Sequence, residues 1–143
     1  MEKQLNILLS DFVVEYHKLQ NFHWYVKGKD FFQVHAKLEE LYDHVNGAID
    51  ELAETMLMVD YTPLASLKDF SANATIQEAD AKYITSDEVM KEVLSDFKAL
   101  LKSIKALKHG AEDNNLDVVA ILMDDYIKEF TKSIWMMSQV VES

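Results

Sequence analysis

The chain has 143 residues, with 25 acidic against 14 basic side chains and a formal net charge of −11. This length suits one domain with a substantial core, and 49% hydrophobic residues argue against disorder. The absence of cysteine excludes disulfides, thiol catalysis and cysteine-ligated metals, while the acidic balance disfavours simple nucleic-acid binding.

Signals for membranes and export are missing from the sequence. No apolar run approaches the roughly 20 residues that span a bilayer. The start of the chain is amphipathic and lacks a signal-peptide cleavage pattern. We therefore expect one cytoplasmic domain over residues 1–143, with no membrane contact.

The first two predicted elements are long helices, because 3 glycines and 1 proline are too few for an all-β chain. Apolar residues from Leu5 to Leu19 recur every three or four positions and predict a helix over 3–26. Gly28 marks a tight turn, with Asp30 as the N-cap of a second helix over 31–60. The core stripe of that helix is Leu38, Leu41, Tyr42, Val45, Ile49, Leu52, Met56 and Val59.

The connection that follows is about 25 residues long, which is unusual in a compact bundle. Thr62 and Pro63 are predicted to open a short helix over 64–70 within it. A connection of this length allows the chain to cross from one end of a bundle to the other.

Two further long helices complete the predicted fold. Thr85 and Glu88 form a capping box for the third long helix, which Gly110 is expected to end. Asn114 is expected to cap the fourth, which runs to the end of the chain. Four long helices with a long second-to-third crossover predict an all-α, ferritin-like four-helix bundle.

Polar residues interrupt the pattern of plain core helices. His35 and Glu39 are four positions apart, as are Asp50 and Glu54, and all four lie within about 100° on a helical wheel. His23 continues the apolar stripe of the first helix. Histidine and carboxylate ligands together suit Fe(II), Mn(II) or Zn(II). The alternatives are a solvated helix flank for the carboxylates and a hydrogen-bonded core histidine for His23.

One copy of the second helix cannot bring both pairs to one metal, because His35 and Asp50 are about 22 Å apart along it. An antiparallel contact between two copies, crossing between residues 44 and 45, would place His35 opposite Glu54 and Glu39 opposite Asp50. The same register pairs Phe32 with Leu57, Ala36 with Ala53, and Asp43 with Asn46.

This self-complementary register predicts two equivalent sites in a two-fold dimer. Each site would take His23, His35 and Glu39 from one subunit, and Asp50 and Glu54 from its mate. No histidine has a glutamate three residues before it, so the conventional two-metal site within one bundle is disfavoured.

Three segments in this order resemble the signature of the Dps mini-ferritins: NFHWYVKG at 21–28, FFQVH at 31–35 and DELAE at 50–54. The resemblance covers nearly the whole chain. It implies a twelve-subunit hollow shell with two-iron ferroxidase sites between subunits. It also implies oxidation of Fe(II), preferably by hydrogen peroxide, and storage of the ferric mineral, which protects against oxidative damage.

The ligands of the family carry over to His23, His35, Asp50 and Glu54. Glu39 stands where the family commonly has Asp. Thr55 stands where an Arg often follows the last ligand. Iron is the expected metal, with Zn or Mn as substitutes.

Other residues acquire expected roles from the same resemblance. Trp24, next to His23, would serve as an electron source or radical sink, or alternatively pack at an interface. Glu112, Asp113 and Asp117 lie where the family lines pores through which iron enters, although helix capping would also explain these acids.

Two other functions are considered alongside the ferroxidase. Many Dps proteins bind DNA through Lys/Arg-rich terminal extensions, and this chain has none, so DNA binding is not expected. A non-enzymatic cage that binds or compacts DNA is the alternative function. A metal-dependent hydrolase on a smaller bundle with three histidines is disfavoured by the carboxylate-rich site.

Overall fold

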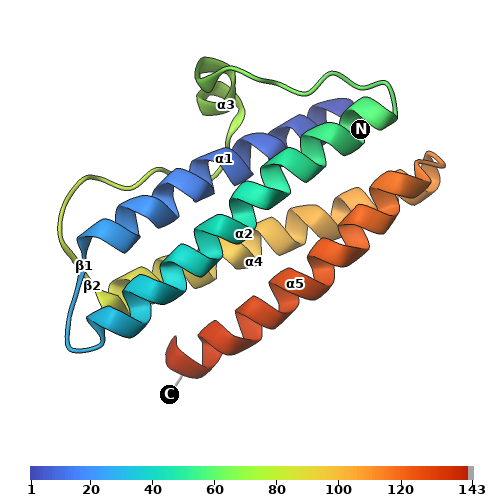
Figure 1. Ribbon diagram of the computed structural model, residues 1–143. Coiled ribbons are helices and arrows are strands. Elements are labelled where there is room, and N and C mark those ends of the chain that lie inside the picture. Colours follow the sequence, from blue (N-terminus) through green and yellow to red (C-terminus); the bar gives the residue numbers. More distant parts are fainter. Residues whose placement is uncertain (142–143) are drawn as a thin grey trace.

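Four long helices form the body of the protein in a computed structural model that describes residues 1–141 (Figure 1). They are α1 (Glu2–Tyr25), α2 (Phe31–Met58), α4 (Ser86–Asp113) and α5 (Asp117–Val141). A short helix, α3 (Leu67–Asn73), lies within the crossover from α2 to α4. The expected all-α, ferritin-like bundle is confirmed. The fourth long helix was also predicted to continue to the end of the chain. The last two positions, 142 and 143, lie outside the described residues.

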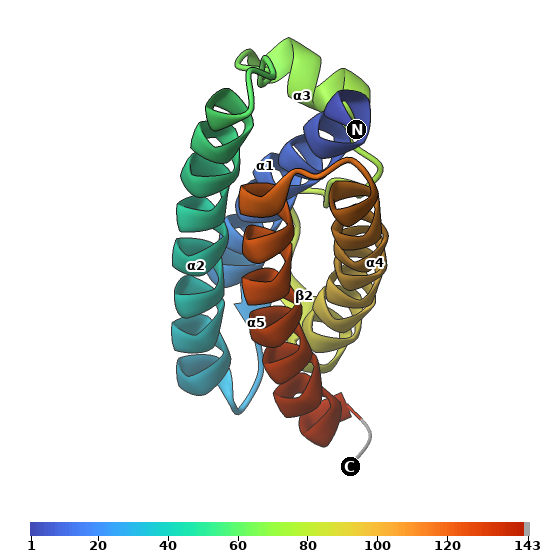
Figure 2. The ribbon, with the colours of Figure 1, turned by 90° about the vertical axis from the view of Figure 1, so that its right-hand side faces the viewer.

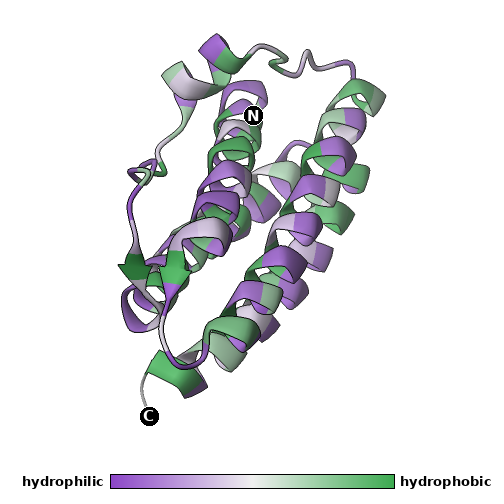
Figure 3. Ribbon diagram, turned by 60° about the vertical axis from the view of Figure 1, so that its left-hand side comes forward, coloured by the Kyte–Doolittle hydropathy of each residue, from purple (hydrophilic) through white to green (hydrophobic). Residues whose placement is uncertain are grey.

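The four long helices run side by side (Figure 2), and buried apolar residues from all four form the core between them. Figure 3 shows hydrophobic and hydrophilic residues alternating along these helices. α1 packs mainly on α2, and α4 on α5. Aromatic rings join these two pairs: Phe12 of α1 stacks on Phe130 of α5 with centroids 6.0 Å apart. The Tyr126 hydroxyl donates to Glu51 Oε1 at 3.0 Å and lies 3.2 Å from the Ala48 carbonyl oxygen, which fastens α5 to α2.

A parallel pair of two-residue strands, β1 (Val26–Lys27) and β2 (Ile84–Thr85), joins the α1–α2 turn to the start of α4. Such short strands give no alternating pattern, so the sequence could not predict them. Gly28 has φ 153° in this turn. Asp30 occupies the expected N-cap position, but its carboxylate accepts a hydrogen bond from Ser86 Oγ at 2.6 Å and makes no capping bond.

The short helix begins later than predicted, because the chain before it is held against α1. The Thr62 amide donates to Glu2 Oε2 at 2.8 Å. The Asn6 amide group donates to the Thr62 carbonyl, and its oxygen accepts from the Leu64 amide. These bonds keep the segment extended, and Ser66 caps the helix instead of Thr62 and Pro63.

Asp11 holds the other side of the crossover. Its carboxylate accepts hydrogen bonds from the Thr75 amide, the Thr75 hydroxyl and the Ile76 amide. Asn6 and Asp11 are both buried polar residues on α1. Two polar side chains of one helix therefore position both ends of α3 and its flanking loops.

The corner between α4 and α5 also differs from the prediction. Gly110 does not end α4, which continues to Asp113. The left-handed residue at the corner is Asn115, with φ 57°. Asn114 is the C-cap of α4, and its side chain donates to the Gly110 carbonyl at 2.7 Å. Asparagine tolerates this backbone region, so it replaces the expected glycine.

The start of α4 follows the prediction. The Glu88 amide donates to Thr85 Oγ1 at 3.3 Å, which is the first half of the expected capping box. Among residues 1–141, no helix combines the length and the apolar character that crossing a membrane requires.

A buried ionic cluster between α1 and α4 was not predicted. Lys18 Nζ lies 2.9 Å from Asp96 Oδ2 and 3.1 Å from Glu92 Oε2. Glu15 is completely buried beside it. Burial and the negative charge of Asp96 raise the pKa of Glu15 well above its ordinary value. Glu15 therefore stays protonated to a higher pH than an exposed carboxyl.

Candidate metal centre

Two histidines meet face to face where α1 turns back into α2. His23 lies in the last turn of α1, and His35 lies in the second turn of α2. Their rings are stacked, with centroids 3.7 Å apart and an interplanar angle of 11°. His23 is buried and His35 is half-buried. The tight turn at Gly28, fixed by the strand pair, produces this juxtaposition.

Each of these histidines hydrogen-bonds to the backbone of the other. His23 Nδ1 lies 2.7 Å from the His35 carbonyl oxygen, and His35 Nδ1 lies 2.7 Å from the His23 carbonyl oxygen. A carbonyl oxygen only accepts, so each Nδ1 carries the proton. In the neutral rings the lone pair is therefore on Nε2. Metal-binding histidines are typically held in this way by a hydrogen bond at the second ring nitrogen.

Glu39 stands on the ligand side of His23. Its Oε1 lies 3.7 Å from His23 Nε2, which is too long for a hydrogen bond. A metal ion between these two atoms would be held by the His23 nitrogen and the Glu39 carboxylate together. His23 and Glu39 are thus placed as two ligands of one metal would be.

Asp50 and Glu54 do not join this group within one chain. Both are exposed on α2, and Asp50 is about 22 Å from the level of His35 along the helix. Among the described residues of one chain, no cluster of three or more His, Asp or Glu side chains is arranged to hold a metal ion. The structure therefore shows a pair of oriented histidines with one adjacent carboxylate, and two further carboxylates at a distance.

Aromatic rings enclose the histidine pair. The Tyr42 ring meets the His23 ring edge-on, with centroids 5.4 Å apart and an interplanar angle of 82°. Phe31 stacks on the other histidine, with its centroid 4.8 Å from that of His35. The sequence placed Tyr42 in the core stripe and missed its contact with the site. Its spacing of seven positions from His35, or two helical turns, was the available signal.

The remaining predicted residues lie elsewhere. Trp24 is 63% exposed. It lines a surface cavity with Val14, His17, Lys18, Gln20, Asn21, Glu78 and Ala79. Glu112, Asp113 and Asp117 are exposed at the α4–α5 corner. Their predicted roles require neighbouring subunits and stay predictions.

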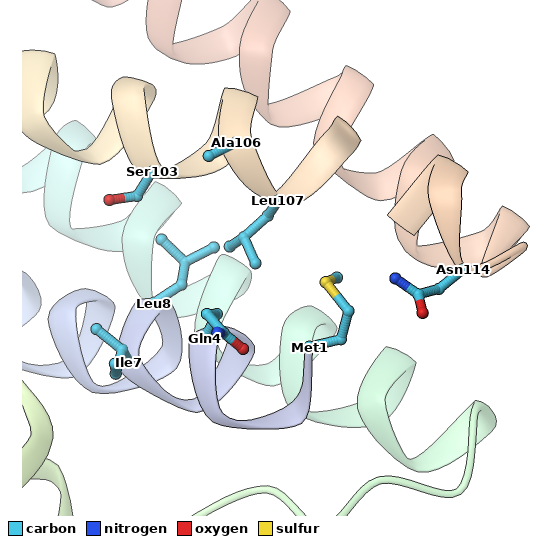
Figure 4. A pocket seen from close by; sticks show the side chains of 8 residues that line it. All are labelled: Met1, Gln4, Ile7, Leu8, Ser103, Ala106, Leu107 and Asn114. Carbon is cyan, nitrogen blue, oxygen red and sulfur yellow. The ribbon is translucent and has the colours of Figure 1, made fainter. Parts of the chain in front are cut away.

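Another cavity lies between the start of α1 and the end of α4 (Figure 4), at the opposite end of α1 from His23. It has a volume of about 460 Å³. Its lining residues are Met1, Gln4, Ile7, Leu8, Ser103, Ala106, Leu107 and Asn114. None of these side chains is acidic or imidazole, so this cavity is not the candidate metal centre.

Comparisons with known proteins agree with this fold. The family of ferritin-like domains matches residues 2–143. A DNA protection during starvation protein from Helicobacter pylori is 36% identical over 133 residues, covering 93% of this chain and 92% of that protein. The crystal structure of a Dps protein from Bacillus brevis superposes with a TM-score of 0.94 at 34% identity, covering 98% of this chain and 93% of that one.

The description of a second similar structure names a chemical class of metal-binding protein. A Dps protein from Vibrio cholerae O1, described as a member of a broad superfamily of ferritin-like diiron-carboxylate proteins, superposes with a TM-score of 0.93 at 32% identity. The match covers 98% of this chain and 87% of that one. Fold and matches together define a ferritin-like four-helix protein. Within that class, the chain belongs to the Dps family of mini-ferritins.

Proposed function

We propose that this protein is a ferroxidase and iron-storage cage that oxidises Fe(II), preferably with hydrogen peroxide, and retains the ferric mineral. The observation that carries the proposal is the reciprocal hydrogen bonding of His23 and His35, which leaves Nε2 of each ring available as a metal ligand, with Glu39 3.7 Å from Nε2 of His23. Membership in a family with ferritin-like diiron-carboxylate relatives supports iron as the metal.

The complete site is proposed to form between two subunits. His23, His35 and Glu39 of one chain would face Asp50 and Glu54 of its mate. The face of α2 that would form the contact exposes large apolar side chains: Phe32 is 81% exposed and Leu57 is 59% exposed. These two residues oppose each other in the predicted antiparallel register, and apolar surface of this kind marks interaction sites. Their exposure in one chain supports a two-fold partner.

Two irons at one site would allow peroxide to be reduced in a single two-electron event. Two Fe(II) ions supply two electrons, and peroxide takes them up with two protons to give two water molecules. One-electron reduction of peroxide by a lone Fe(II) would instead release a hydroxyl radical. A paired site of this kind would therefore protect against oxidative damage.

Membership in the family supports a larger assembly. We propose a homo-oligomer built from such dimers, with a dodecamer as the expected form, located in the cytoplasm. Glu112, Asp113 and Asp117 would guide iron inward, and Trp24 would pack at an interface or exchange electrons with the site. Zn or Mn would substitute for iron in binding. The alternative is a non-enzymatic cage that binds DNA, which the charge of −11 disfavours.

Anaerobic Fe(II) titration of the purified oligomer, followed by peroxide, tests the proposal. We expect two Fe(II) oxidised per peroxide by a discrete shell of about twelve subunits. An intact shell that oxidises no iron above the buffer background would contradict the enzyme assignment. A salt-sensitive DNA mobility shift would favour the DNA-binding alternative.

A further inference from the structure

The cavity between the start of α1 and the end of α4 has the size and the lining of a small-molecule site (Figure 4). Its volume of about 460 Å³ falls within the range of roughly 300–1,000 Å³ that ligand pockets occupy. Leu8 and Leu107 are buried, and their side chains point toward each other between the two helices. Gln4, Ser103 and Asn114 are exposed polar residues around them. An apolar floor with a polar rim fits a ligand that is apolar at one end and polar at the other.

The part of α4 that borders this cavity is basic, although the whole chain has a net charge of −11. Between Asp96 and Glu112, α4 carries four lysines and no acidic residue. Within residues 1–141, one of these four, Lys108, forms an ion pair, with Asp124 of α5 at 2.8 Å. The other three are exposed: Lys98, Lys102 and Lys105. Positive charge is therefore available on this side of an acidic protein.

The unpaired lysines continue around the rim of the cavity. Lys102 lies one helical turn before Ala106, which lines the cavity on α4. Lys3, which is also exposed, lies one turn before Ile7, which lines it on α1. With Lys105, one turn beyond Lys102, they form a set that we call the rim lysines.

The acidic residue nearest to Lys3 in the sequence does not neutralise this rim. Glu2 lies in the first turn of α1, and its Oε2 accepts a hydrogen bond from the Thr62 amide at 2.8 Å. Its carboxylate is therefore held against the crossover. The lining of the cavity itself contains no carboxylate.

We propose that this cavity binds a small anionic amphiphile, with a linear acyl chain against Leu8 and Leu107 and a carboxylate head group at the rim lysines. Burial of methylene groups between apolar side chains supplies affinity, and the ammonium groups supply charge-assisted hydrogen bonds to the carboxylate. The cavity lies at the opposite end of α1 from His23, so this binding is separate from the proposed iron chemistry.

The charge of the preferred ligand separates this site from general adsorption. A chain of net charge −11 attracts cations over most of its surface, so adsorption would favour a cationic amphiphile over an anionic one of equal length. Binding at the rim lysines reverses the order. Decanoate should bind most tightly, decanol more weakly, and decylammonium most weakly.

Isothermal titration calorimetry of the intact oligomer tests the proposal with these three compounds, each below its micelle-forming concentration. We expect one decanoate per chain, bound at least about tenfold more tightly than hexanoate, because four more methylene groups are buried. Lys3→Gln combined with Lys102→Gln should weaken decanoate binding by about tenfold and leave decanol binding unchanged. Lys91→Gln combined with Lys132→Gln makes the same charge change at exposed positions outside the cavity and should bind decanoate as the wild type does.

A second pair of variants tests the apolar part of the site. Ala106→Trp fills the cavity from α4 and should abolish decanoate binding at unchanged oligomer size. Ala99→Trp, two turns earlier on the same helix and also exposed, is the matched control and should bind normally. If Ala106→Trp does not assemble, the lysine variants decide the question, because they leave the lining intact.

Three results would overturn the proposal. The first is wild-type affinity of decanoate for Ala106→Trp or for the Lys3 and Lys102 variant. The second is tighter binding of decylammonium than of decanoate, which would mark adsorption to the acidic surface. The third is an intact oligomer that takes up no decanoate, which would show that a neighbouring subunit covers the cavity.

Discussion

The carbonyl oxygen of His35 lies 2.7 Å from Nδ1 of His23, and the same distance separates the carbonyl oxygen of His23 from Nδ1 of His35. Each ring is therefore oriented by the backbone segment that carries the other. Removing either imidazole removes one proposed ligand and the ring stacked on its partner, but leaves the carbonyl oxygen that orients the remaining ring.

The proposed ligand role of the two histidines predicts a severe effect of single substitutions. His35→Ala should lower Fe(II) or Co(II) affinity by at least about tenfold, because it removes one ligand and the ring stacked on His23. Anaerobic titration followed by Co(II) absorption measures this. His17→Ala changes an exposed histidine of α1 and should bind as the wild type does. Equal affinity of His35→Ala and the wild type would exclude His35 from the site.

Metal binding should depend on the α2–α2 contact. Asn46 lies near the predicted crossing and is exposed in one chain. Asn46→Trp places a bulky, uncharged side chain there and should prevent both dimerisation and metal binding, while helix content is retained. Light scattering and metal titration on the same samples test the link. Ser71→Trp, on exposed α3, is the control. A metal-loaded monomer would refute the shared site.

The bridge from Tyr126 to α2 predicts a local loss of stability. Tyr126→Phe removes the hydroxyl that contacts Ala48 and Glu51 and should lower the free energy of unfolding by about 1 kcal/mol. Chemical denaturation monitored by circular dichroism measures the change. Tyr83→Phe, at a residue that is 67% exposed, should differ little from the wild type. An equal loss of unfolding free energy in both variants would show that the Tyr126 hydroxyl does not contribute to stability.

The buried Glu15 predicts a specific dependence of stability on pH. Its pKa in the folded protein is raised above the ordinary value of 4.5 by burial and by Asp96. The folded state therefore binds a proton that the unfolded state releases above that value, so Glu15 contributes a loss of stability as pH rises. The loss begins near the unfolded pKa and continues up to the folded one.

Glu15→Gln keeps a neutral donor at this position and removes the titration. Its unfolding free energy should fall less steeply between about pH 5 and pH 7 than that of the wild type. Denaturation across this range measures both slopes. Glu40→Gln, at an exposed position of α2, should leave the slope unchanged. Parallel curves for Glu15→Gln and the wild type would contradict the raised pKa.

Helical periodicity was sufficient to predict the four long helices, because their buried faces repeat every three or four residues over more than 20 positions. The errors fell where a tertiary contact decided the local structure. Asn6 holds the chain before α3 in an extended form, and Ser86 draws Asp30 away from its capping role. Such partners are 56 or 58 residues apart in sequence, beyond the reach of local patterns.

The candidate site was likewise predictable only in part. The wheel positions of His35 and Glu39 predicted their shared face, and the turn at Gly28 predicted the approach of His23. The stacking of the two rings and their exchange of backbone hydrogen bonds depend on atomic placement across the turn. The contact of Tyr42 with His23 was also not predicted, because an aromatic residue in an apolar stripe is normally interpreted as part of the hydrophobic core.

Asn6 and Asp11 bind the crossover to α1 by side-chain hydrogen bonds to backbone groups at Thr62, Leu64, Thr75 and Ile76. A protease cuts extended, detached chain, and the crossover can supply such chain only after these bonds break. Lys68 is an exposed trypsin site between these anchored positions. Cleavage there should therefore be as slow as unfolding of the bundle, so that the longest connection in the chain is also a poor place to cut it.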